Sequence, residues 1–326
     1  MPVFRAPLHR LLTQDPIANY HDLNFVQIFA EHRLHNILGR SGKSTVFRAT
    51  RILDQQEQAL KIYNPKFIDH HWKIRKIREM EILLSIPWKR AVRGRSTGVS
   101  DTLHYLEMDL APGVPLDSFT FCNDITTHQR LVITLGILRA VQEVHHAQII
   151  HGDIKPENIM VSADHEVKIV DFGVSRRSDE ILTMDRQELV GSMGYIAPEL
   201  FPHDLETSYL TDIFSLGMTL FYLWTDTHGC LANSPQTFLD RITYFRPEAS
   251  LLAHGTPQAL TTLISGMVAC DPQHRIADID QALTMTAELM DLYRWQGTVD
   301  HHPMPKHRGD LSSTTHDLLA VALSAT

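Results

Sequence analysis

The sequence predicts an α+β protein that folds into two lobes, and three observations support this. Short runs rich in apolar and β-branched residues, the last of them at Leu103–Met108, fall in the first third of the chain. A long apolar stretch with helical character follows at residues 125–148. Between them, residues 109–113 (Asp-Leu-Ala-Pro-Gly) change the composition in a way that suits a hinge, and 326 residues are enough for two packed lobes.

The composition is that of a globular protein, with 43% hydrophobic and 21% charged residues. The formal net charge of -8 would repel nucleic acid and anionic lipid, so we expect no nucleic acid partner. Cys122, Cys230 and Cys270 lie far apart and form no Cys-x-x-Cys pair. This pattern predicts neither a disulfide framework nor a zinc knuckle, and it favours a reducing compartment, the cytoplasm, while leaving delivery into another cell open.

We expect no secretory signal in this sequence. The N-terminus lacks the apolar stretch of roughly 7–15 residues that a signal peptide needs. The longest apolar run, at residues 131–138, is closed by Arg139 and is far shorter than the ~20 residues that span a bilayer. We therefore expect no membrane-spanning segment. The 20 histidines lack the His-Glu-x-x-His spacing of a zinc site, so we expect them to be packed or solvated.

The N-terminal elements begin after residues 1–33, which carry no motif and are assigned to an N-terminal extension. A glycine-bearing turn at residues 39–44 lies between two strand-like runs. Gly42-Lys43-Ser44 imitates the end of a P-loop, but that motif requires a glycine at position 37, where the chain has Ile37. Residues 45–47 (Thr-Val-Phe) favour a strand rather than the helix that follows a P-loop.

The next strand predicted, at residues 58–63, places Lys61 on the face opposite Leu60 and Ile62. Such a lysine is either a surface residue of an edge strand or a functional cation on an inner face.

Helical periodicity follows at residues 74–84, with an apolar stripe that includes Ile74, Ile77 and Leu84. A short basic cluster at residues 89–95 is then typical of a solvated loop, with phosphate binding or docking as the alternative.

The polar run from His151 to Asn158 concentrates chemically useful side chains in eight residues that Pro156 prevents from forming one helix. Apolar segments flank it on both sides, which predicts a loop held between buried elements. Eighteen residues after Asp153, Asp171 stands at the end of the strand-like residues 167–170. A second carboxylate is thus expected at a strand end.

These two segments resemble the catalytic loop and the metal-binding triplet of protein kinases. The resemblance covers residues 34–292, and residues 191–199, 212–217 and 271–275 match further kinase motifs. It implies the two-lobed protein-kinase fold. A small β-rich N-lobe with one main helix would occupy residues 34–108. The hinge and a larger, mostly helical C-lobe would occupy residues 109–295, and residues 296–326 would form a C-terminal tail with a short apolar helix at 318–323.

The resemblance also implies catalytic roles. Lys61 would hold the α- and β-phosphates of ATP and would be oriented by Glu79, which is a better match than Glu81. Asp153 would accept or orient the hydrogen bond of the substrate hydroxyl, and Lys155 would neutralise charge on the transferring phosphoryl group.

Asn158 and Asp171 would ligate magnesium (Mg2+) through hard oxygen donors. Glu157 would touch only substrate side chains, as the glutamate at this position of the motif does in kinases that prefer basic substrates. Glu199 and Arg275 would form a buried ion pair that ties the activation segment to the core.

The implied ATP-binding residues come from the turn, two strands and the hinge: Gly39, Ser41, Gly42, Ser44, Val46, Ala59, Lys61, Met108, Asp109 and Ala111. Ser41 and Ser44 replace the second and third glycines of the kinase loop. Because glycine lets backbone N–H groups approach phosphate at the least steric cost, we expect weakened or altered ATP affinity.

Gly152 stands where many kinases have an arginine that clamps a phosphorylated activation segment. Arg176 and Arg177 are expected on the mobile side of that segment, where they would not anchor it. We therefore expect the segment to be held by packing or by a partner, and the enzyme to be active without phosphate on Ser178 or Thr183.

The function expected from this resemblance is that of an ATP-dependent serine/threonine protein kinase acting on a protein hydroxyl. Lys155 and Ser192 resemble the Ser/Thr branch rather than the tyrosine branch. The alternative is a kinase-fold pseudoenzyme or binding protein, or an enzyme that catalyses another nucleotide transfer. Ser41, Ser44 and Gly152 motivate that alternative, because fold alone does not decide function.

Overall fold

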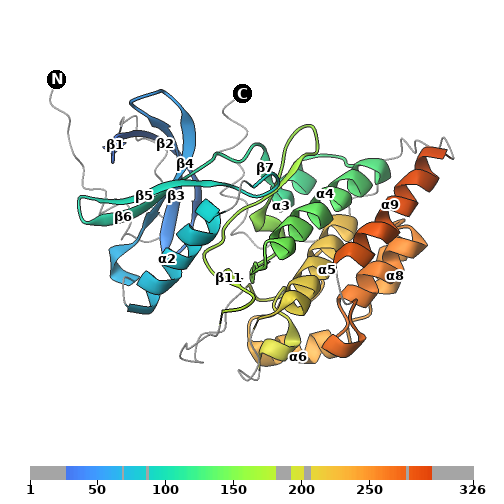
Figure 1. Cartoon of the computed structure of the whole chain (residues 1–326). Helices are drawn as coiled ribbons and strands as arrows, with labels where there is room; N and C mark the ends of the chain where they lie inside the picture. The colour runs from blue at the N-terminus through green and yellow to red at the C-terminus, as the bar shows by residue number, and fades with distance from the viewer. Residues whose placement is uncertain are drawn as a thin grey trace.

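The computed structural model describes residues 27–67, 70–85, 88–180, 192–201, 207–276 and 279–295. In these residues the chain forms an antiparallel sheet with one long helix, followed by a mostly helical lobe (Figure 1). The predicted α+β, two-lobed architecture is confirmed. Residues 109–113, which contain no regular element, connect the lobes. None of the described helices has the length and apolar character needed to cross a bilayer.

The N-lobe sheet has six antiparallel strands in the order β1-β2-β3-β4-β6-β5. They are β1 (Gln27–Phe29), β2 (His32–Arg40), β3 (Ser44–Arg51), β4 (Glu57–Tyr63), β5 (Gly94–Ser100) and β6 (Leu103–Met108). The sheet thus begins before residue 34, and the last residues assigned to the N-terminal extension belong to it. Strand β1 has only three residues, which are too few to show an alternating pattern in the sequence. Because β3 follows the glycine-bearing turn directly, the P-loop interpretation is excluded.

Helix α2 (His70–Ser85) packs against β5 and turns an unexpected face toward the core. Ile82 and Leu83 are buried, and so is Glu79, whereas Ile77 is 51% and Leu84 43% exposed. The predicted apolar stripe is therefore wrong for Ile77 and Leu84. Hydrophobic periodicity assigns apolar residues to the core, but here a paired carboxylate occupies part of the buried face.

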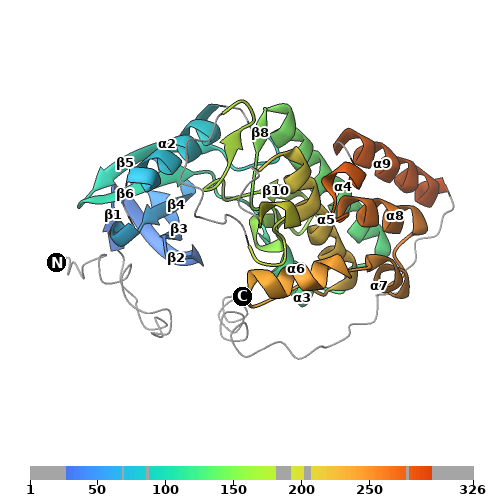
Figure 2. The same cartoon turned by 90° about the horizontal axis from the view of Figure 1, so that it is seen from below.

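The C-lobe is built around α4 (Thr127–His146) and α5 (Tyr209–Thr225). A capping box in which Thr126 and Gln129 bond reciprocally starts α4. Helix α9 (Ile279–Trp295) lies alongside α4 at the end of the lobe away from the sheet, and α8 (Gln258–Met267) packs on α5 (Figures 1 and 2). The other described α-helices of the lobe are α3 (Leu116–Cys122), α6 (Pro235–Thr243) and α7 (Pro247–Ala253).

Short strands position the two polar segments that the sequence singles out. β9 (Ile159–Val161) pairs with β10 (Val167–Ile169) and with β7 (Val114–Pro115), while β8 (Ile149–Ile150) pairs with β11 (Arg176–Arg177). Residues 151–158 therefore form a loop between β8 and β9, and Asp171 follows β10, as predicted. The predicted helix at 318–323 and the tail to 326 lie outside the described residues.

The expected ion pair between Glu199 and Arg275 is present in the C-lobe. The Arg275 guanidinium donates from Nη1 to Glu199 Oε1 at 2.7 Å and from Nη2 to Oε2 at 3.0 Å. It also lies 5.1 Å from the centre of the Phe214 ring and donates from Nε to the Ala269 carbonyl. The Arg275 side chain is completely buried, so the segment that carries Glu199 is held against the helical core.

Replacing Arg275 with methionine should lower the free energy of unfolding by about 3 kcal/mol, because it leaves the Glu199 carboxylate buried without its cation. Urea denaturation followed by circular dichroism measures this change. The exposed Arg139 on α4 provides the control, and Arg139→Met should change the unfolding free energy by less than about 0.5 kcal/mol. Equal effects of the two substitutions would contradict the role assigned to the pair.

Candidate active site

The backbone of the loop at residues 151–158 is held by the buried carboxylate of Asp212. Asp212 on α5 is 1% exposed and accepts hydrogen bonds from the backbone N–H groups of His151 and Gly152, both at 2.8 Å. Its Oδ2 atom also accepts from His145 Nε2 at 3.0 Å. The sequence places Asp212 in a structural motif without predicting these contacts. Helix α5, which is buried along almost its whole length, thereby fixes the backbone that presents Asp153.

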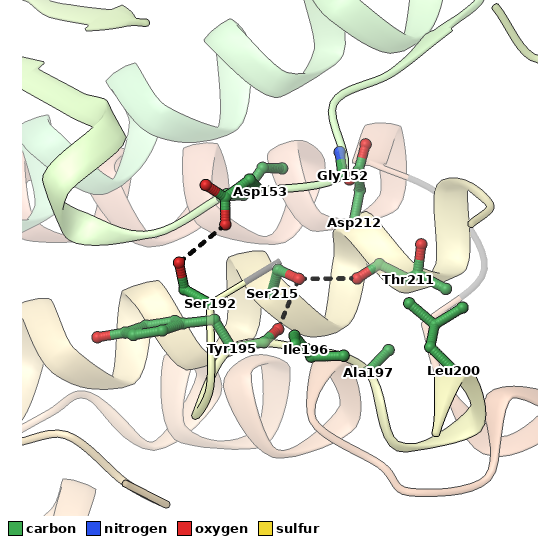
Figure 3. Close-up of a pocket in the computed structure, with 11 residues that line it drawn as sticks. Gly152, Asp153, Ser192, Tyr195, Ile196, Ala197, Leu200, Thr211, Asp212 and Ser215 are labelled. Atoms are coloured by element: carbon green, nitrogen blue, oxygen red, sulfur yellow. Dashed lines mark hydrogen bonds between the residues drawn. The ribbon is translucent and has the colours of Figure 1, made fainter. Parts of the chain in front are cut away.

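Asp153 lies at the centre of a cluster of polar side chains. Asn158 Nδ2 donates to its carbonyl at 2.8 Å and to Oδ2 at 3.0 Å, and Lys155 Nζ lies 2.8 Å from Oδ2. Ser192 Oγ donates to Asp153 Oδ1 at 3.0 Å (Figure 3). The same hydroxyl accepts from Lys155 Nζ at 2.5 Å. Three predicted site residues are thus brought together, with Ser192 from a distant segment as a fourth member.

Lys61 lies on β4, an interior strand of the sheet, and is buried. Its ammonium is 2.6 Å from Glu79 Oε1 on α2 and 2.9 Å from Asp171 Oδ1 in the C-lobe. This geometry excludes the interpretation of Lys61 as a surface residue of an edge strand. Burial disfavours the charge, but the Asp171 and Glu79 carboxylates outweigh it and hold the pKa of Lys61 well above its ordinary value.

Glu79 is the glutamate that meets Lys61, whereas Glu81 is exposed. The second oxygen of Glu79 accepts a hydrogen bond from the Tyr63 hydroxyl at 2.8 Å. Burial, followed by the Glu79 charge, holds the pKa of Tyr63 well above its usual value, so the hydroxyl keeps its proton and donates. Sequence reasoning missed Tyr63, although its position two residues after Lys61 on the same strand face was a signal.

Asp171 is positioned by the residues around it in the chain. Its φ of +62° is in the left-handed region, which aspartate tolerates better than most residues. Phe172 is fully buried, with its ring 4.9 Å from that of His151 and 5.7 Å from that of Trp88. The Lys61 charge lowers the pKa of Asp171 to about 2. Its carboxylate is therefore ionised at neutral pH and available as a ligand.

The chemistry of the donor set fits magnesium. Asp171 offers a carboxylate that is about half exposed, and Asn158 has its Nδ2 committed to Asp153, which leaves the amide oxygen as the ligand atom. Magnesium is commonly held by one or two such oxygen donors together with substrate phosphates. In the described part of the chain, no cluster of three His, Cys, Asp or Glu side chains could hold an ion alone.

The glycine-bearing turn folds back on itself. Ser41 N donates to the Ser44 carbonyl at 2.8 Å, and Ser41 Oγ accepts from the N–H groups of Lys43 and Ser44 at 3.3 and 3.1 Å. Asn64 Nδ2 holds the Gly42 carbonyl at 3.1 Å. Three backbone N–H groups are therefore used within the turn, and they would have to be released before they could bind a phosphate. The expectation that the two serines alter ATP affinity stays a prediction.

Four of the predicted ATP-binding residues share one face of the sheet. Val46 pairs with Lys61 across β3 and β4, and Ala59 pairs with Met108 across β4 and β6. Cross-strand partners point to the same face, so these four side chains lie together on the side that carries Lys61. Beyond β6, the hinge residue Asp109 is paired with Arg95, Nε to Oδ1, at 2.6 Å. At least one member of the basic cluster thus braces the hinge instead of forming a solvated loop.

The structure corrects the expectation for Arg176. Gly152 adopts a φ of +79°, which favours glycine, and it has no side chain that could bind a phosphate. Arg176, however, is buried, and its Nε donates to Thr207 Oγ1 at 2.9 Å. It is therefore an anchor of this segment and not a mobile residue. Thr183 lies outside the described residues.

A small pocket opens beside Asp153 (Figure 3). Its walls come from the catalytic loop, from residues 192–200 and from the start of α5. Ser215 Oγ donates to the Tyr195 carbonyl at 2.7 Å and so fixes one wall to α5. The pocket is adjacent to the Ser192 hydroxyl, on the C-lobe side of the site.

Comparison with known proteins gives consistent matches. The family model described as protein kinase domain matches residues 32–286. The chain is 30% identical over 269 residues to the serine/threonine-protein kinase PknH of Mycobacterium tuberculosis, covering 81% of this chain and 43% of PknH. It is 27% identical over 252 residues to PrkC of Bacillus subtilis, covering 76% and 39% of the two chains. It spans less than half the length of these curated relatives.

Tyr63→Phe should lower the free energy of unfolding by about 1–3 kcal/mol, because it leaves a buried Glu79 oxygen without its donor. Thermal unfolding measured by calorimetry tests this expectation. Tyr244 is 80% exposed, and Tyr244→Phe is the matched control that removes the same hydroxyl from the surface. A Tyr63→Phe protein as stable as the control would show that the hydroxyl does not hold Glu79.

Proposed function

The chain belongs to the protein kinase family, and we propose that it is an ATP-dependent serine/threonine protein kinase. It would transfer the γ-phosphate of ATP to a hydroxyl of a protein substrate. The observation that carries the proposal is the position of the Lys61 ammonium, within hydrogen-bond distance of Glu79 from the N-lobe and of Asp171 from the C-lobe. Phosphoryl transfer requires this kind of fixed positive charge beside a metal ligand.

The proposed mechanism assigns Lys61 to the α- and β-phosphates of ATP. Glu79 fixes the direction of the ammonium, and Tyr63 fixes Glu79. The Ser41–Ser44 turn covers the phosphates less closely than a glycine-rich loop would. Val46, Ala59 and Met108, with the hinge backbone at Asp109 and Ala111, form the adenine side of the site.

Asp153 orients the substrate hydroxyl and accepts its proton as the oxygen attacks the γ-phosphorus and ADP leaves. Lys155 neutralises charge on the phosphoryl group as it moves from ADP to the substrate oxygen. Ser192 holds both side chains, which supports the assignment to the serine/threonine branch. When bound, magnesium held by Asp171 and Asn158 supplies charge neutralisation at the phosphate oxygens.

The protein's partners and location are also proposals. Substrates are proteins that present a serine or threonine, and Glu157 in the catalytic loop would favour basic side chains near that residue. The three cysteines are all free, which supports a reducing compartment such as the cytoplasm.

The decisive experiment is incubation of the purified protein with γ-labelled ATP, magnesium and a protein mixture. The proposal requires acid-stable label on serine or threonine. A parallel reaction with α-labelled ATP should leave the proteins unlabelled. Label from the α-position would indicate nucleotide transfer instead, and nucleotide binding without any label would indicate a binding protein.

Lys61→Ala and Asp171→Ala should each reduce phosphotransfer by orders of magnitude, because one removes the phosphate cation and the other a metal ligand. Initial rates with γ-labelled ATP measure the loss, and circular dichroism checks the fold. Lys168→Ala, on β10 near Asp171 in sequence, is the control and should keep the wild-type rate. Near-normal turnover in either site variant would refute the assignment of that residue.

Asp153→Asn should reduce kcat more than Glu157→Gln does. The first substitution changes the group beside the attacking hydroxyl, whereas the second alters a contact with substrate side chains only. Steady-state kinetics with a short basic peptide separate the two effects, and Glu157→Gln should act mainly on the KM for that peptide. Equal losses of kcat would contradict this division of roles.

A further inference from the structure

An ion pair connects helix α2 with the segment that follows Asp171. Arg78 lies on α2, next to Glu79, and Glu180 follows the short strand β11. Arg78 donates from Nε and Nη2 to Glu180 Oε1, at 2.9 and 2.5 Å. Only 13% of the Arg78 side chain and 34% of the Glu180 side chain are exposed, so solvent screens this pair less than it screens a surface pair.

On the C-lobe side of the ion pair, backbone hydrogen bonds hold Glu180 in place. Arg176 Nη1 donates to the carbonyls of Arg177 and Glu180, both at 3.2 Å, and Glu180 N donates to the Arg177 carbonyl at 3.3 Å. Arg176 pairs in β11 with Ile150 of β8, directly before the catalytic loop. The position of Glu180 is therefore fixed relative to the loop that carries Asp153.

The N-lobe end determines where Glu79 points. Adjacent residues of a helix project about 100° apart, so Arg78 and Glu79 reach different partners from one turn of α2. Arg78 reaches Glu180, and Glu79 reaches Lys61. A displacement of α2 that withdrew Glu79 from Lys61 would also separate Arg78 from Glu180. The ion pair consequently opposes that displacement.

Glu180 occupies a position that burial alone would not favour. Its Oε2 atom is buried, and among the described residues no donor lies within hydrogen-bond distance of it. Leaving a buried acceptor without a donor costs free energy, which the bonds from Arg78 offset. Gly152 meanwhile offers no cation that could bind a phosphate on this segment. A permanent carboxylate can provide the anionic anchor instead, from the side of the segment itself.

We infer that Glu180 is a positioning residue, whose carboxylate holds Arg78 and thereby keeps Glu79 on Lys61 without phosphorylation of the segment. The inference rests on the proposed function, since it explains how the phosphate-binding lysine stays oriented. It adds a residue outside the predicted site and a reason why an enzyme with Gly152 needs no phosphate clamp.

The test compares phosphatase-treated wild-type protein with Glu180→Gln and with Asp179→Asn. Asp179 is the adjacent, exposed carboxylate, so its variant is the matched control. Hydrogen exchange of the α2 amides, read by mass spectrometry, should accelerate about tenfold in Glu180→Gln and remain unchanged in Asp179→Asn. The rate of phosphotransfer should fall about tenfold in Glu180→Gln only, with the loss in kcat and the peptide KM unchanged.

A charge exchange distinguishes positioning from a general loss of stability. Arg78→Glu and Glu180→Arg should each release α2, whereas the double variant should restore at least half of the lost rate and protection. Failure of the double variant to recover either, while it unfolds at the wild-type temperature, would overturn the inference.

The outcomes separate this inference from the proposed function. Wild-type protein that transfers no phosphate would refute the proposed function, but hydrogen exchange would still decide whether Glu180 holds α2. Active wild-type protein with equal exchange and equal rates in Glu180→Gln would overturn the inference and leave the proposed function standing.

Discussion

The Lys61 ammonium forms ion pairs with carboxylates from both lobes. A buried ammonium without partners would be strongly disfavoured, and here its charge is matched by Glu79 from α2 and by Asp171 from the C-lobe. The rest of the site follows from this requirement. Tyr63 orients Glu79, and the packing of Phe172 on His151 orients Asp171. The relative position of the lobes is therefore linked to the ionic state of three side chains.

The C-lobe provides a rigid support for this junction. Asp212 holds the backbone of the catalytic loop from α5, and Arg275 holds the segment after Ser192 through Glu199. Side chains that must be placed precisely thus project from loops whose backbones are bonded to buried helices. The Arg78 and Glu180 pair extends the same arrangement toward α2. We propose that phosphate on the segment is unnecessary, because a fixed carboxylate supplies the anionic contact.

Sequence motifs locate Lys61, Asp153 and Asp171 because each has a recognisable local pattern, namely a strand face, a polar loop and a strand end, respectively. Local patterns cannot reveal partners that are distant in the chain. Ser192 reaches Asp153, and Glu180 reaches Arg78, only through the tertiary fold. Periodicity also misassigned α2, where Ile77 is exposed and Glu79 is buried. Glu79 can face the core because the Lys61 ammonium pairs with its carboxylate. The sequence of the helix alone does not show that this partner exists. Strands β2, β3, β4 and β6, by contrast, follow from local apolar runs and turn residues. Strand β1 is too short to show such a pattern, and β5 begins inside the basic run that is typical of a solvated loop.

We propose that Lys61, Glu79 and Asp171 together form the binding site for a magnesium nucleotide. A crystal structure with a non-hydrolysable ATP analogue and magnesium provides the test. Phosphate oxygens are expected beside Lys61 Nζ, with Glu79 still bonded to it, and a metal is expected to be ligated by Asp171 and Asn158. A nucleotide bound elsewhere, or bound here with Lys61 turned away from its phosphates, would contradict it.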